Sequence, residues 1–311
     1  MSVDRRKFLS LSAGIGGLAL TPFQTLFAED RAFGIPEKFA LQVMATNWGF
    51  AGSVDAFCDK AKQAGYDGIE VWWPGDATAQ TALFDALKKY SLQVGFLAGG
   101  SDKDPAKHFQ QFKQMLDGAA YQQVQRPLYI NCHSGRDFFP MEENGKFIEY
   151  TDSVAKATGL LICHESHRSR ILFAAHVAKQ YIQQYPGLKL TLDISHWCNV
   201  HESLLHDQEE TVQLALARTN HIHARIGHPE GPQVNDPRAP EWETTVKRHL
   251  GWWDAVVQAK IKDGSNRITI LTEFGPPDYM PTLPYTRQPV ADQWAINVYM
   301  MQLLRKRYQN A

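Results

Sequence analysis

The chain has 311 residues, enough for one large α/β domain or two domains of ordinary size. Hydrophobic residues make up 44% of it and charged residues 21%, as is usual for a soluble globular protein. The formal net charge is −1, and no stripe of Lys and Arg interleaves with aromatic residues. The charge pattern therefore gives no support to nucleic acid as a partner.

The N-terminal residues are typical of an export signal and not of a folded element. The segment Asp4-Arg5-Arg6-Lys7-Phe8-Leu9 precedes a mildly apolar, Gly- and Ala-rich run at 11–20, which resembles a twin-arginine signal. That run is too short and too rich in glycine to span a bilayer, which argues against a membrane anchor. We expect residues 1–28 to be a signal peptide recognised by the twin-arginine translocase and removed near Ala28. Residues 29–311 would then form a periplasmic protein.

From Phe39 onward, segments with strand and helix character alternate along the chain. Apolar runs predict eight strands, at 40–44, 68–73, 92–97, 127–131, 159–164, 190–193, 219–225 and 268–271. Apolar or small residues at helical spacing predict a helix after each strand, at 54–64, 78–90, 105–121, 142–158, 169–185, 203–218, 242–260 and 289–307. Gly65 is placed to end the first of these helices.

Eight strands that are each followed by a helix predict an α/β protein with a single (β/α)₈ TIM barrel, at 29–311. A doubly wound open sheet is the competing architecture. It would normally carry a Gly-x-Gly-x-x-Gly turn after a strand, and this chain has none. Two long, Pro-rich segments, at 227–241 and 274–289, follow the seventh and eighth strands. Loops of this kind overhang the active-site face of a barrel, so we expect them to form substrate walls or lids.

The four cysteines, at positions 58, 132, 163 and 198, lie far apart in the sequence and form no Cys-x-x-Cys pair. An oxidising compartment would permit disulfides. Three of the four, however, stand at the ends of predicted strands. We interpret the cysteines as small buried hydrophobic residues.

Four successive strands end in residues that bind metals. Glu165, Asp193 and Glu273 occupy the last inward position of strands five, six and eight, and His223 faces inward from strand seven. A single Asp at this place is usually a helix cap, but four such strand ends in a row favour a metal centre. Three carboxylates and one imidazole suit a divalent ion, with Mn²⁺ preferred and Mg²⁺, Co²⁺ or Zn²⁺ as alternatives.

Several short motifs, in this order along the chain, resemble those of the xylose-isomerase-like TIM-barrel superfamily. They are Ala64-Gly65-Tyr66-Asp67-Gly68-Ile69-Glu70, Glu165-Ser166-His167, Asp193-x-x-His196, His223 and Glu273. The superfamily includes sugar isomerases, ketose 3-epimerases, inosose dehydratases and apurinic endonucleases. The resemblance implies that Glu165, Asp193, His223 and Glu273 bind the metal. It also implies that Glu165 and Glu273 move protons and that His196 contacts the substrate.

Further residues are candidates for substrate binding. Arg225 could anchor an oxygen-rich substrate, although it follows His223 more closely than the corresponding arginine of the epimerases. The other candidates, some with a structural role as the alternative, are His133, His167, Trp72 and His228. By strand parity or depth, a structural role is expected for Trp73, His164 and His221.

These patterns lead to one main hypothesis and three alternatives. The main hypothesis is an exported, metal-dependent carbohydrate enzyme, an isomerase or epimerase, that works through a metal-stabilised enediolate. A lyase or hydratase acting on keto-sugars or 3-keto-glycosides would start from the same intermediate. A non-catalytic carbohydrate-binding barrel is disfavoured by the intact set of ligands. An apurinic endonuclease needs three metals and an Asp-x-His pair that strand seven lacks. The sequence leaves open which sugar is bound and whether the chain forms a homo-oligomer.

Overall fold

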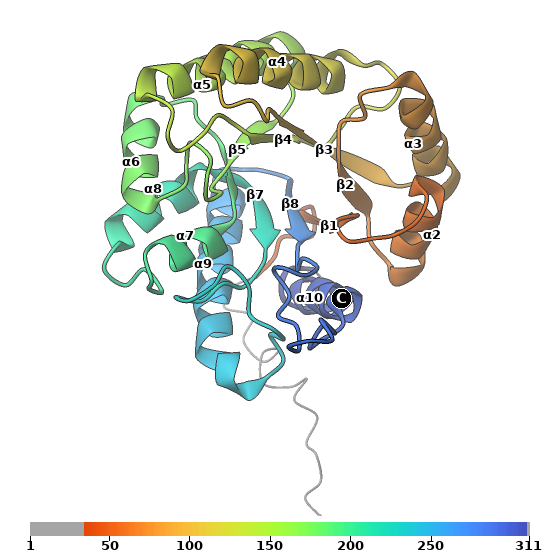
Figure 1. Cartoon of the computed structure of the whole chain (residues 1–311), viewed down its shortest axis with the longest axis vertical. Coiled ribbons are helices and arrows are strands. Elements are labelled where there is room, and N and C mark those ends of the chain that lie inside the picture. Colours follow the sequence, from red (N-terminus) through yellow and green to blue (C-terminus); the bar gives the residue numbers. More distant parts are fainter. Residues whose placement is uncertain (1–33, 310–311) are drawn as a thin grey trace, which may run out of the picture.

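The computed structural model describes residues 34–309. Its eight strands are all parallel and close into a barrel in the order β1-β2-β3-β4-β5-β6-β7-β8. The helices surround the strands, and the last helix packs beside β1 and β8 (Figure 1). The predicted TIM barrel is therefore confirmed. The predicted signal peptide lies outside the described residues.

The elements are as follows. The strands are β1 (Ala40–Thr46), β2 (Gly68–Trp72), β3 (Gln93–Gly99), β4 (Ile130–His133), β5 (Ile162–Glu165), β6 (Leu190–Leu192), β7 (Thr219–Ala224) and β8 (Arg267–Thr272). The helices are α2 (Val54–Ala64), α3 (Ala77–Tyr90), α4 (Pro105–Tyr121), α5 (Met141–Thr158), α6 (Ala175–Gln184), α7 (Ile194–Val200), α8 (Glu209–Arg218), α9 (Glu243–Lys262) and α10 (Gln293–Tyr308), with a 3₁₀ turn η2 (Pro240–Trp242).

The sequence-based boundaries differ from the structure at a few places, for local reasons. Strand β4 begins at Ile130 and not at Pro127, whose nitrogen has no hydrogen to donate to a neighbouring strand. Gly159 adopts the left-handed conformation that ends α5, so β5 starts only at Ile162. A single helix was predicted after β6, but the structure has two. The additional helix, α7, begins directly after Asp193, whose side chain caps it by accepting a hydrogen bond from the Ser195 amide at 3.1 Å.

The barrel interior is apolar at one level and polar at the next. A small buried cluster of Met44, Tyr129 and Leu271 is separate from the larger core between strands and helices. Gly95 leaves room for the Tyr129 ring, because a Cβ at position 95 would lie only 2.6 Å from the Tyr129 hydroxyl oxygen. The Tyr129 ring stacks on His221 at a centroid distance of 3.8 Å. This apolar cluster therefore adjoins the polar groups of the barrel interior.

Several structural predictions are confirmed. All four cysteines are free and buried. Trp73 is buried and packs edge-on against Phe96, at a centroid distance of 5.1 Å. Gly65 ends α2 in the left-handed conformation. No helix within residues 34–309 has the length and apolar character needed to cross a membrane.

His164 has the structural role predicted for it. It is buried, with Nδ1 2.7 Å from the Ser134 hydroxyl and Nε2 2.7 Å from the Thr151 hydroxyl. Thr151 gives its own hydrogen to the Ile148 carbonyl, so it accepts the Nε2 hydrogen, and the Ser134 hydroxyl can donate to Nδ1 of the neutral ring. Burial lowers the pKa of His164 to about 3. The unfolded chain therefore takes up a proton here before the folded protein does, so this contribution to stability is lost as the pH falls from about 6.5 toward 3.

We expect His164→Gln to flatten the dependence of stability on pH. In the wild type, this histidine should account for a loss of about 2 kcal/mol in the free energy of unfolding between about pH 7 and pH 5. Urea unfolding at the two pH values measures the difference. The variant should be less stable at the higher pH but should lose less on acidification. The exposed His206→Gln is the control, and equal slopes for His164→Gln and the wild type would contradict the account.

Candidate active site

The four predicted metal ligands come together at the carboxyl ends of the strands. Glu165 ends β5, Asp193 follows β6, His223 lies on β7 and Glu273 follows β8. One ligand atom of each residue lies within 4.8 Å of those of the others. Strand parity alone therefore predicted a cluster that the fold assembles from four separate strands.

His223 lies between the two glutamates of this cluster. Its Nδ1 is 2.9 Å from Glu273 Oε2 and 3.7 Å from Glu165 Oε1. Glu165 Oε2 accepts hydrogen bonds from the Asn131 amide at 2.7 Å and from His133 Nε2 at 2.8 Å. Glu165 Oε1, in contrast, is buried without a hydrogen-bond partner. That oxygen is available to a cation, which would remove the cost of leaving it unpaired.

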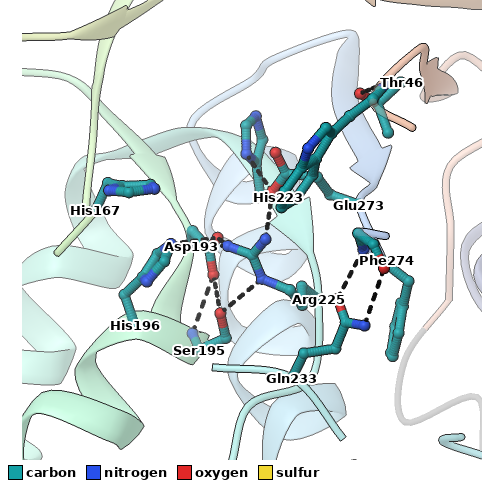
Figure 2. Close-up of polar contacts among 12 residues, drawn as sticks. Thr46, His167, Asp193, Ser195, His196, His223, Arg225, Gln233, Glu273 and Phe274 are labelled. Atoms are coloured by element: carbon teal, nitrogen blue, oxygen red, sulfur yellow. Dashed lines mark hydrogen bonds and ion pairs between the residues drawn. The ribbon is translucent and has the colours of Figure 1, made fainter. Parts of the chain in front are cut away.

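The guanidinium of Arg225 lies between Asp193 and Glu273 (Figure 2). Nη2 contacts Asp193 Oδ2 and Nη1 is 3.5 Å from Glu273 Oε2. Nε donates to the Ser195 hydroxyl at 3.1 Å, and Nη2 also donates to His196 Nε2 at 2.8 Å. Arg225 is almost fully buried, so it is a fixed positive charge within the cluster. Each carboxylate oxygen has two lone pairs, so the contact with Arg225 does not prevent Asp193 Oδ2 from binding a metal.

The cluster holds more negative than positive charge. Three ionised carboxylates and one guanidinium would leave two negative charges at this largely buried site if His223 were neutral. Burial would lower the pKa of His223, but the surrounding glutamates, Glu273 foremost, raise it well above its usual value. Burial raises the pKa of Asp193 to about 7, although Arg225 acts in the opposite direction. A divalent cation would supply the missing charge, and the donors, mostly oxygen with one nitrogen, fit such an ion.

A cavity of about 250 Å³ opens next to the cluster. It is lined by Thr46, Asn47, Trp48, Trp72, Leu97, His133, His167, Arg225, Glu273 and Tyr279. Four of the six residues predicted to bind substrate thus face it, namely Trp72, His133, His167 and Arg225. The side chain of Trp72 is half-exposed and meets the His133 ring edge-on, at a centroid distance of 5.1 Å.

The other two predicted substrate residues do not line the cavity. His196 is completely buried in the first turn of α7, with its ring centroid 4.0 Å from that of His167. His228 lies in the loop after β7, which folds back on itself through backbone hydrogen bonds between His228 and Gly231. The His228 ring packs against Trp242, at a centroid distance of 4.9 Å. His196 therefore contacts His167, which lines the cavity, without lining it itself, and the loop fold directs His228 to Trp242.

The two long loops differ in what they contribute. Tyr279, from the loop after β8, lines the cavity and packs edge-on against Trp48 at 4.8 Å. From the loop after β7, Gln233 holds the backbone of Gly275, accepting from its amide at 2.7 Å and donating to its carbonyl at 3.3 Å. The loop after β8 therefore forms a cavity wall, as predicted, and the loop after β7 supports that wall.

Sequence reasoning missed several residues of the site. Glu70 on β2 is buried, with its carboxylate oxygens 3.2 Å and 3.4 Å from His223 Nε2. In the sequence, Glu70 has the same inward parity on its strand as Trp72, and this parity could have identified it. Trp48 stands beyond the end of β1, in a loop where parity gives no guidance. Asn131, inward on β4, contacts both Glu165 and His223.

The two glutamates predicted to move protons differ in their access to the cavity. Glu273 lines it directly and its side chain is 14% exposed, whereas Glu165 is buried and absent from its lining. His133 lines the cavity and is hydrogen-bonded to Glu165. Burial would raise the pKa of Glu165, but the neighbouring His133 and His223 hold it well below its usual value. Glu165 therefore reaches the cavity through His133.

Comparison with known proteins gives a likeness in fold. No family model matches the chain, and no curated protein matches it. Among solved structures, the apo form of an E. coli 3-keto-D-glucoside 4-epimerase is 12% identical, with a TM-score of 0.54 over 85% of this chain and 99% of the other. A D-tagatose 3-epimerase-like protein is 13% identical, with a TM-score of 0.57 over 86% of this chain and 98% of the other.

A xylose isomerase domain protein from Alicyclobacillus acidocaldarius is 13% identical, with a TM-score of 0.56 over 86% of this chain and 99% of the other. All three matches cover nearly the full length of the solved chains. At these identities they show the shared barrel fold, and the chemistry of this chain has to be argued from its own residues.

We expect the metal-free protein to bind about one equivalent of Mn²⁺ near neutral pH and to release on the order of one proton per ion. The release follows from the raised pKa values of His223 and Asp193, which keep protons on the cluster until a cation replaces them. Isothermal titration in two buffers with different ionisation enthalpies measures both quantities. Asp193→Asn should weaken binding. Absence of binding, or binding without proton release, would contradict the assignment of the cluster.

Proposed function

We propose that this protein is a divalent-metal-dependent enzyme that isomerises or epimerises a sugar or sugar derivative through an enediolate. The observation that carries the proposal is the cluster of Glu165, Asp193, His223 and Glu273, which adjoins a cavity that Glu273 itself lines. Mn²⁺ suits these donors best, with Mg²⁺, Co²⁺ or Zn²⁺ as alternatives. The likeness in fold to a 3-keto-D-glucoside 4-epimerase and a D-tagatose 3-epimerase-like protein supports the same class of substrate.

The reaction needs an acidified C–H bond and groups that move its proton. A divalent ion held by these residues would polarise a substrate carbonyl and so make the C–H of the neighbouring hydroxyl-bearing carbon more acidic. Glu273 is the ligand that reaches the cavity directly, so we assign to it the removal of that proton. His223 Nδ1 lies 2.9 Å from Glu273 Oε2 and fixes the direction of this carboxylate.

On the other side of the cavity, we assign proton transfer to His133 together with Glu165. Glu165 Oε2 lies 2.8 Å from His133 Nε2, which leaves Nδ1 as the nitrogen that can exchange a proton with the substrate. The low pKa of Glu165 keeps it ionised, so it stabilises the imidazolium that forms when His133 takes up a proton. Glu165 therefore takes part in proton transfer, as predicted, but acts through His133 and not directly on the substrate.

The cavity wall supports a cyclic sugar as the substrate. Trp48, Trp72 and Tyr279 are aromatic residues that line one cavity of about 250 Å³, and both tryptophans are partly exposed, at 37% and 44%. Flat aromatic faces match the apolar face of a pyranose ring. Arg225 and His167 in the same lining offer donors for the sugar oxygens. Keto-sugars and 3-keto-glycosides fit both the wall and the chemistry.

The proposal also includes the cellular location of the enzyme and the product of its reaction. The export signal expected at residues 1–28 would put the enzyme, and hence its sugar, in the periplasm. A lyase or hydratase would form the same enediolate and then expel a group from the next carbon. The released product separates these reactions from isomerisation or epimerisation, and a non-catalytic sugar-binding barrel would give no product.

The test is proton exchange in D₂O, followed by NMR, across a panel of keto-sugars and 3-keto-glycosides with Mn²⁺ present. The wild type should incorporate deuterium next to the carbonyl of its substrate. Glu273→Gln should lower the exchange rate by about 10²-fold or more. His133→Gln should also slow exchange, and Mn²⁺ should still bind, because no ligand is removed and Asn131 still donates a hydrogen bond to Glu165. The exposed Glu241→Gln is the matched control and should behave as the wild type does.

A metal-loaded wild type that exchanges no proton of any compound in the panel would contradict the proposed chemistry. Loss of a leaving group in place of epimer or isomer formation would assign the lyase reaction instead.

A further inference from the structure

We propose that Glu70 and His221 are positioning residues, which hold His223 so that its Nδ1 faces the metal. The inference rests on the metal centre of the proposed function and concerns residues that lie deeper in the barrel. Glu70 comes from β2, and both histidines come from β7. All three side chains are buried, with at most 1% of each exposed.

The two ring nitrogens of His223 face in opposite directions. Nδ1 faces the cluster, 2.9 Å from Glu273 Oε2, and Nε2 faces Glu70, 3.2 Å and 3.4 Å from its two oxygens. An imidazole that binds a metal through Nδ1 carries its hydrogen on Nε2. Glu70 is then the acceptor of that hydrogen. A carboxylate in this place fixes the ring orientation and makes the imidazole a stronger ligand.

Asn131 does not compete for this role. The amide nitrogen of Asn131 is the atom that faces His223 Nε2, at 3.2 Å, and the same nitrogen donates to Glu165 Oε2 at 2.7 Å. A nitrogen that donates cannot accept the hydrogen on Nε2. Among the described atoms within 3.4 Å of His223 Nε2, the two oxygens of Glu70 are thus the acceptors.

His221 holds Glu70 from the other side. Its Nδ1 lies 2.9 Å from the Thr269 carbonyl oxygen, which can only accept, so Nδ1 carries a hydrogen. Its Nε2 lies 3.3 Å from Glu70 Oε2 without a hydrogen bond between them, so this edge of the ring limits the movement of the Glu70 carboxylate by contact. Tyr129 stacks on the ring at 3.8 Å and prevents it from turning away. The Glu70 carboxylate therefore lies between two imidazoles that come from one strand.

This arrangement is not what stability alone would select. A buried carboxylate costs several kcal/mol in desolvation, and well-packed apolar residues usually serve a barrel interior at least as well. The apolar cluster of Met44, Tyr129 and Leu271 next to it shows that this barrel accommodates such residues. A role in orienting His223 gives the carboxylate a function that an apolar side chain could not perform.

The same three residues could instead bind a second ion, since one ligand atom of each lies within 4.8 Å of those of the others. That arrangement requires His223 Nε2 to give up its hydrogen to a metal, whereas the positioning role requires it to keep that hydrogen. The number of bound ions and the hydrogen on Nε2 therefore distinguish the two arrangements.

The experiment compares metal binding by the wild type, Glu70→Gln, Glu70→Ala and His221→Gln. Isothermal titration with Mn²⁺ gives the affinity and stoichiometry. We expect one ion per chain in the wild type and a Kd raised by about 10- to 100-fold in Glu70→Ala, with a smaller rise in Glu70→Gln. Asp254→Asn is the matched control. It alters another buried carboxylate, one paired with Arg307 far from the site, and should leave the Kd unchanged.

Long-range ¹H–¹⁵N NMR of the Zn²⁺-loaded protein, with ¹⁵N-labelled histidine, detects the hydrogen on His223 Nε2. A purely structural role for Glu70 would leave this signal unchanged. The Nε2 hydrogen of His223 should be protected from exchange in the wild type and lost to exchange in Glu70→Ala. A wild type that binds no metal would overturn the proposed function itself. Equal affinity in folded wild type and Glu70→Ala would overturn only the positioning role. A second ion that disappears in His221→Gln would overturn it in favour of a second metal site.

Discussion

Three carboxylates buried together at the mouth of the barrel are the constraint on which the rest of the site depends. Glu165, Asp193 and Glu273 lie within reach of one another, where water can screen them little. Arg225 neutralises part of their charge through Asp193 and Glu273. His223 lies next to the negative charge that Arg225 leaves unbalanced. The raised pKa of His223 reflects how strongly these carboxylates attract positive charge. A divalent cation completes this balance, which is why we place the chemistry here.

The barrel separates the tasks of the site by depth. The deepest polar level, with Glu70 and His221, is enclosed by protein, and we propose that it orients the residues above it. The middle level holds the proposed metal ligands. The outer level is the cavity, where Glu273 and His133 meet whatever molecule enters. One strand can supply two levels, as β7 does with His221 and His223, because alternate residues of a barrel strand face inward at successive heights.

The sequence was most informative where the strand period governs. Parity placed Glu165, His223 and Glu273 at inward strand ends, and the structure brings them together with Asp193. Asp193 satisfies both interpretations that its position allowed, since it caps α7 and also joins the cluster. The same parity applies to Glu70, which faces inward from the middle of β2 and not from its end.

The remaining residues could not be derived from the strand period because loops and long side chains position them. Arg225 lies beyond the end of β7, and only the fold shows that its guanidinium turns onto Asp193. Trp48 and Tyr279 belong to different loops that meet at the cavity. His228 was expected near the substrate, but hydrogen bonds within its own loop direct it to Trp242. These positions depend on contacts between distant segments, which a single sequence does not display.

The most direct measurement is anomalous X-ray diffraction at the manganese edge from crystals grown with Mn²⁺. The account predicts one strong peak about 2.0–2.4 Å from a ligand atom of each of Glu165, Asp193, His223 and Glu273. Absence of a peak among these four residues, or a peak between Glu70 and His221 in its place, would contradict the account.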